Sequence, residues 1–141
     1  MKKIISVSLL FLFVATFFTS TGIAANKNTK AVVSKSAKVE VYYFHFTRRC
    51  VTCQAVETES QKAIAALYPV QYKKGLVTFK SVNLDLKGSE VLASKCKVEG
   101  QALLVISGHK RIDLTDKGFM YALNSAGKLR AEMKKVIDPM L

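Results

Sequence analysis

The junction between one apolar strand and one amphipathic helix limits the folds open to this chain more than any other feature. Residues 39–46 (Val-Glu-Val-Tyr-Tyr-Phe-His-Phe) are β-branched and aromatic, which is typical of a buried strand. A turn at 47–49 follows, and a helix is expected over residues 50–67. Its core-facing stripe repeats every three or four residues, at Cys53, Val56, Ser60, Ala63 and Leu67. The junction therefore predicts a strand–helix unit whose helix packs on a sheet.

The rest of the chain continues this alternation. Residues 76–85 read as a second strand, and Ser89 can cap a short helix that carries Val91, Leu92 and Cys96. Residues 102–107 and 111–114 are expected to be strands joined at 108–110, a spacing typical of a hairpin. Residues 127–137 are expected to form a terminal helix. The order β-α-β-α-β-β-α predicts an α/β sandwich, with a mixed central sheet and helices on both faces.

The first 25 residues differ from the rest of the chain in charge and hydropathy. Lys2 and Lys3 precede 22 uncharged residues, 4–25, which are most apolar at 9–15. A basic start, a short apolar run and small residues near its end are the layout of a secretory signal peptide, with cleavage expected after Ala24. An uncleaved segment of this length could instead span a bilayer. We predict a signal peptide (1–25), a flexible polar leader (26–38) and one domain (39–141), in a protein exported to the periplasm or the cell exterior.

Length and charge narrow the possible partners. The chain has 141 residues, enough for one domain, and its net charge is +12 from 22 Lys and Arg against 10 Asp and Glu. Loss of Lys2 and Lys3 with the signal peptide leaves +10, a balance that attracts acidic partners. The lysines are scattered and the tyrosines show no RNA-binding pattern, so no nucleic-acid partner is expected. We expect a monomer with a basic surface, which touches a membrane only if the signal segment stays uncleaved.

The candidate catalytic residues are the two cysteines of Cys50-Val51-Thr52-Cys53, directly after the first strand. Cysteines three residues apart on the first helical turn share a face, so their sulfur atoms can reach bonding distance. The positive end of the helix dipole, with Arg48 and Arg49 just before the motif, should lower the pKa of Cys50 and make it the attacking thiolate. Cys53 lies on the core-facing stripe and should be shielded as the resolving thiol. Zinc sites also use CxxC, but this position favours a redox role.

The junction resembles the active-site unit of the thioredoxin-like superfamily, and residues 77–85 and 95–105 resemble that family's next strand and the segment entering its hairpin. More narrowly, residues 42–57 (Tyr-Tyr-Phe-His-Phe-Thr-Arg-Arg-Cys-Val-Thr-Cys-Gln-Ala-Val-Glu) are similar to small exported ArsF-type nitrophenyl compound nitroreductase subunits. The resemblance implies a three-layer thioredoxin-like sandwich. It also implies a thiol–disulfide oxidoreductase, or a redox-carrying subunit, without a cofactor beyond its disulfide. Its partners would be protein thiols, protein disulfides or a redox partner in the cell envelope.

Two positions depart from the family's pattern. Its cis-proline opposite the disulfide corresponds here to Gly100-Gln101-Ala102, which contains no proline. A non-proline cis bond costs about 3 kcal/mol, so the bond before Ala102 is expected to be trans and the substrate groove altered. The family's buried acid, which helps deprotonate the second cysteine, corresponds to Phe44. Glu40 or Glu57 could substitute for it. Both changes concern dithiol reduction and leave disulfide formation between the two cysteines intact.

The third thiol, Cys96, leaves two interpretations open. It can be a small buried apolar residue at the end of the second helix. It can instead join Cys50 and Cys53 in a three-thiolate site for a thiophilic metal or metalloid, with His45 or His109 as a fourth ligand only in principle. His45 is expected to be packed, and His109 to be solvated at the hairpin tip. The leading prediction is a redox protein, with a soft-metal binding protein and a non-catalytic binding module as alternatives.

Overall fold

The computed structural model describes residues 38–141, so the predicted signal peptide and all but the last residue of the predicted leader lie outside the described residues. The elements follow in the order β1 (Val39–His45), α1 (Val51–Leu67), α2 (Pro69–Lys73), β2 (Val77–Asn83), α3 (Ser89–Cys96), β3 (Ala102–Ser107), β4 (Lys110–Asp113), α4 (Thr115–Tyr121), α5 (Ala126–Ile137) and a 3-10 turn (Asp138–Met140).

The strands form a four-stranded mixed sheet in the order β2-β1-β3-β4. β1 and β2 are parallel, with Val39 opposite Val77, because the helical crossover through α1 returns the chain to the same edge. β1 and β3 are antiparallel, with Phe44 opposite Ala102, and β4 continues β3 through a hairpin. The first strand is therefore central, and the predicted mixed sheet is confirmed.

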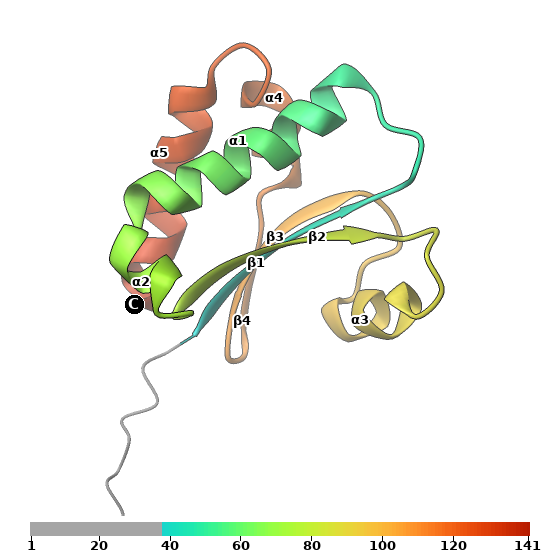
Figure 1. Cartoon of the computed structure of the whole chain (residues 1–141), viewed down its shortest axis with the longest axis horizontal. Helices are drawn as coiled ribbons and strands as arrows, with labels where there is room; N and C mark the ends of the chain where they lie inside the picture. Colours follow the sequence, from blue (N-terminus) through green and yellow to red (C-terminus); the bar gives the residue numbers. More distant parts are fainter. Residues whose placement is uncertain (1–37) are drawn as a thin grey trace, which may run out of the picture. The chain divides into compact units, whose positions relative to one another are not determined.

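Alternate residues of β1 enter two separate cores. Val39, Val41 and Tyr43 face α1, α4 and α5, where they pack with residues such as Ile64 and Met133. On the other face, Tyr42, Phe44 and Leu104 pack against Ala93 and Cys96 of α3. Figure 1 shows α1 and α5 on one side of the sheet and α3 on the other. This confirms the predicted fold class, a three-layer α/β sandwich of the thioredoxin-like kind.

The structure contains two short helices that the sequence pattern did not predict. Pro69 begins α2 instead of only ending the preceding helix, because proline fits the first turn, where its missing N–H has no intrahelical partner. The sequence pattern predicts no element over the residues of α4, because Gly118 in its middle lowers the intrinsic helix propensity.

The predicted cap of α3 was wrong. The N-cap is Gly88, in the left-handed region at φ 94°, and Ser89 is the first helical residue. The Ser89 hydroxyl donates to the carbonyls of Leu84 and Leu86 instead of accepting from a helix N–H.

Both cores are formed entirely by residues between Val39 and Met140. A chain that begins at Asn26 therefore retains every residue that builds the described fold. Within residues 38–141, no helix is long and apolar enough to cross a membrane.

Candidate functional site

The loop between β1 and α1 is held in place by the residues that follow the neighbouring parallel strand. The Thr47 backbone N–H donates to Asp85 Oδ2 at 2.7 Å, and Asn83 Nδ2 donates to the Thr47 hydroxyl at 2.9 Å. The Leu84 N–H donates to the His45 carbonyl at 2.7 Å. The hydrogen bond from Thr47 lowers the pKa of the Asp85 carboxyl. The start of α1 is thereby fixed to the end of the sheet.

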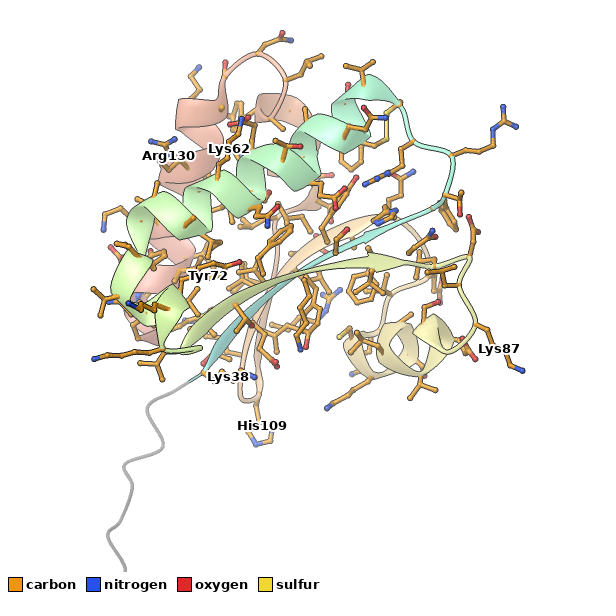
Figure 2. All side chains as sticks on the ribbon, in the orientation of Figure 1. Lys38, Lys62, Tyr72, Lys87, His109 and Arg130 are labelled. Atoms are coloured by element: carbon orange, nitrogen blue, oxygen red, sulfur yellow. A yellow bond between two sulfur atoms is a disulfide. The ribbon has the colours of Figure 1, made fainter. Side chains whose placement is uncertain are left out.

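Cys50 and Cys53 form a disulfide at the first turn of α1, and their Cα atoms lie 5.1 Å apart. Cys50 is the N-cap, and its Sγ accepts a hydrogen bond from the Cys53 N–H at 3.2 Å. Cys50 is exposed, whereas only 4% of Cys53 is accessible. The expected asymmetry between an accessible and a shielded sulfur is therefore present. Figure 2 shows the disulfide as a yellow bond at the start of α1.

The two arginines before the motif differ in their surroundings. Arg48 is exposed and forms no ion pair among residues 38–141. Arg49 is partly buried, and its guanidinium donates to Glu57 Oε2 in a salt bridge. Glu57 therefore compensates the charge of Arg49, whereas the charge of Arg48 has no such partner among residues 38–141.

The salt bridge also distinguishes the two acids considered as substitutes for the family's buried acid. Glu57 lies one helical turn after Cys53, and residues four apart on a helix are neighbours. Glu40 lies near the start of β1, at the other end of the strand, where it pairs with Lys38 and Lys80. Glu57 is therefore the acid next to the cysteine motif.

Tyr43 is a polar residue near the site that sequence reasoning missed. Its ring is fully buried on the α1 side of the sheet, and its hydroxyl has no hydrogen-bond partner within the described residues. Burial raises the pKa of this hydroxyl, and the positive charge of Arg49 partly opposes the shift. Phe44 faces α3 instead. Strand alternation could have indicated Tyr43, because Val39 and Val41 occupy the same face.

His45 and His109 occupy the environments expected for them. His45 is 7% exposed, its ring stacks on Tyr43, and its Nδ1 donates to the Phe46 carbonyl at 2.9 Å. His109 is exposed at the tip of the β3–β4 hairpin.

Gly100, Gln101 and Ala102 lie where β3 begins, at the same end of the sheet as the end of β1. Residues 38–141 contain no cis peptide bond, so the bond before Ala102 is trans, as predicted. The three residues line a polar hollow of about 310 Å³ together with residues 97–99, Arg111, Asp113, Thr115 and Asp116. Neither cysteine of the disulfide lines this hollow.

Cys96 is buried in the core on the α3 side of the sheet, where burial raises the pKa of its thiol. Its carbonyl accepts a hydrogen bond from Arg111 Nε at 3.0 Å. Cys50 caps α1 and Cys53 lies in its first turn, and α1 packs on the other face of the sheet. The structure of residues 38–141 contains no group of three or more His, Cys, Asp and Glu that could hold a metal ion. Cys96 is thus buried as in the first interpretation, and the structure of residues 38–141 does not group it with Cys50 and Cys53.

The four-strand order and the disulfide at the junction of β1 and α1 define a thioredoxin-like α/β sandwich with a CxxC disulfide. No protein-family model matches the chain, and no curated protein matches it. One similar solved structure is described as the structure of a malarial protein. It is 25% identical, the alignment covers 70% of this chain and 96% of that chain, and the TM-score is 0.44.

Proposed function

We propose that the protein is a thiol–disulfide oxidoreductase, or the redox-carrying subunit of a larger system, that acts through Cys50 and Cys53. The observation that carries the proposal is the asymmetric disulfide at the start of α1. An accessible sulfur at a helix N-terminus meets the positive end of the helix dipole and a backbone N–H donor, and both favour the thiolate. A buried partner sulfur one turn later can then close the disulfide.

The reaction proceeds by two thiol–disulfide exchanges. The Cys50 thiolate attacks a substrate disulfide, a mixed disulfide forms, and the first substrate thiolate leaves and takes a proton from solvent. Cys53 then loses its proton and attacks Cys50 Sγ. The Cys50–Cys53 bond forms and the second substrate thiolate leaves. Two electrons pass from the protein dithiol to the substrate, and the same steps in reverse oxidise a substrate dithiol.

A glutathione redox titration tests the proposal. The potential of the Cys50–Cys53 pair is expected in the range of catalytic disulfides, above about −300 mV. Reduced Cys53→Ser protein should form a stable mixed disulfide with oxidised glutathione, because its exposed thiol remains and no second thiol can resolve the adduct. Cys50→Ser should not form this adduct, and Cys96→Ser should behave like wild type. A potential well below about −300 mV would instead identify a structural disulfide and reject the proposal.

We also propose that the protein works outside the cytoplasm. The basic start and short apolar run of residues 1–25 support this location, and an oxidising compartment allows a disulfide to persist. N-terminal sequencing of envelope material should give Ala25 or Asn26 as the first residue. Envelope material that still begins at Met1 would contradict cleavage.

A further inference from the structure

Several segments meet at the end of the domain that lies away from the disulfide. The Val39 N–H donates to the Leu76 carbonyl at 2.8 Å, so the chain enters the domain beside the segment that follows α2. The β3–β4 turn lies at the same end, because β3 runs antiparallel to β1. The Tyr68 hydroxyl donates to Asp138 Oδ1 at 2.7 Å and joins the end of α1 to the C-terminal turn. Figure 2 shows Tyr72 and Lys38 toward this end and Lys87 toward the other.

The helix at this end, α2, exposes apolar side chains beside lysines. Val70 is 58% exposed and Tyr72 is 37% exposed. Lys73 and Lys74 follow directly and are exposed as well. No side chain of α2 is buried, so this helix contributes little to the core. Aromatic and aliphatic side chains beside lysines are the composition that partitions into a membrane interface.

The charge at this end is strongly positive. Lys73, Lys74, Lys110 and Lys135 are exposed at this end, and none of them forms a salt bridge with a carboxylate among residues 38–141. Glu40 is already paired with Lys38 and Lys80, and Asp138 with Lys134. Glu132, three residues before Lys135 in α5, forms no salt bridge among residues 38–141. An anionic surface therefore meets more unpaired lysines here than unpaired Asp or Glu side chains.

We propose that this basic end, defined by Val70, Tyr72, Lys73, Lys74 and Lys110, docks on an anionic phospholipid surface. Tyr72 and Val70 enter the headgroup region, and the lysines contact lipid phosphates. The proposal is independent of the redox function but has a consequence for it. Cys50 follows the far end of β1, and seven residues of strand span about 23 Å, so the disulfide is held away from the membrane and open to partners.

Vesicle cosedimentation tests the proposal with the chain from Asn26 onward, because the apolar segment 4–25 would itself enter lipid. The wild type should bind vesicles that contain phosphatidylglycerol and should not bind pure phosphatidylcholine vesicles. Each lysine near an anionic surface contributes about 1 kcal/mol, so Lys73→Gln/Lys74→Gln should lower the partition coefficient about thirtyfold. The matched control is Lys87→Gln/Lys95→Gln, which removes the same charge from exposed lysines elsewhere and should change binding little.

A second variant separates a lipid surface from an acidic protein. Val70→Ser/Tyr72→Ser keeps all charges and should also weaken vesicle binding, because it removes the groups that enter the interface. Wild type that binds soluble polyglutamate as strongly as vesicles, with no effect of this variant, would assign the basic end to an acidic protein and overturn the proposal. Equal losses in the two lysine variants, or no vesicle binding by wild type, would overturn it too. The unfolding temperature of Lys73→Gln/Lys74→Gln protein should match that of wild type, which confirms that the variant is folded.

Discussion

At the scale of single residues, the electrostatic environment of Cys50 depends on a salt bridge that the sequence did not indicate. Arg49 precedes the cysteine, but its guanidinium is held by Glu57. The helix N-terminus and the Cys53 N–H remain available to a thiolate at Cys50. Backbone groups thus lie closest to a Cys50 thiolate, and Arg49 contributes only the positive charge that Glu57 does not compensate.

Glu57→Gln should therefore lower the pKa of the Cys50 thiol, because a nearby negative charge disappears and the Arg49 guanidinium becomes free to face the thiolate. The stabilised thiolate should also make the disulfide more oxidising. Thiolate absorbance is titrated against pH in a Cys53→Ser/Cys96→Ser background. The control is Glu59→Gln, whose carboxylate bonds Lys62 and should not affect Cys50. A rise in the thiol pKa, or no change, would show that the salt bridge does not act on Cys50.

Tyr43→Phe should stabilise the fold by about 1 kcal/mol, because it removes a buried hydroxyl that has no hydrogen-bond partner among residues 38–141 and leaves the packed ring in place. Tyr68→Phe is the matched comparison. It removes the hydrogen bond to Asp138 and should destabilise by about 1 kcal/mol. Urea unfolding of both variants measures the difference. Loss of stability in Tyr43→Phe would show that its hydroxyl makes a favourable interaction in solution.

At the scale of elements, the position of α4 depends on the close packing of Gly118 against Leu103 and Val56. A Cβ at Gly118 would lie 3.2 Å from Leu103 Cδ2 and 3.2 Å from Val56 Cγ1. Both neighbours are fully buried and cannot move aside without disturbing the core. Glycine at this position therefore allows the helix to lie against β3 and α1.

Gly118→Ala should destabilise the protein by about 1–2 kcal/mol, because overpacking outweighs the better helix propensity of alanine. Gly127→Ala is the control, since nothing lies within 4 Å of a Cβ built there and the residue is in α5. It should stabilise by about 0.5–1 kcal/mol. Thermal unfolding of the two variants gives the comparison, and a stabilised Gly118→Ala protein would contradict the packing argument.

The elements that the sequence predicted well are those with a long apolar period. Along α1, Cys53, Val56, Ser60 and Ala63 are buried as predicted. The helix has 17 residues, enough for its 3.6-residue apolar repeat to be recognised in the sequence. The five residues of α2 and the seven of α4 are too short for such a signal. Their positions follow from contacts with distant residues, such as that of Gly118 with Leu103.

In the candidate site, too, the sequence predicted local geometry but not the contacts between residues distant in the sequence. The disulfide spacing and the shielding of Cys53 follow from local geometry, so the sequence predicted both. The partners of the side chains do not follow from local geometry. Nothing in the sequence alone pairs Arg49 with Glu57, eight residues away, or places Cys96 on the opposite face of the sheet from the disulfide.

At the scale of the whole molecule, the Asp138 carboxylate in the C-terminal turn connects the end of α1 to the end of α5. Asp138 accepts hydrogen bonds from Lys134 and from Tyr68, and these hydrogen bonds lower the pKa of its carboxyl below the usual 3.8. The ionised form is thus favoured in the folded state. Burial and the hydrogen bond to Asp138 raise the pKa of Tyr68, so its neutral form is also favoured.

Stability should therefore fall in acid partly through this one group. Because the folded-state pKa of Asp138 lies below its unfolded value, its contribution is complete above pH 3.8 and is lost as the pH falls through the folded value. Asp138→Asn removes the titration, so its unfolding temperature should decline less steeply than that of wild type below pH 3.8, although it starts lower at neutral pH. The control is Asp116→Asn, whose carboxylate has no hydrogen-bond partner among residues 38–141 and which should follow the wild-type slope. If the unfolding temperatures of wild type and Asp138→Asn fall with the same slope in acid, the Asp138 side chain does not couple protonation to folding. The acid sensitivity would then have to come from other carboxylates, of which Asp85, held by Thr47 at the loop before Cys50, is the first to test.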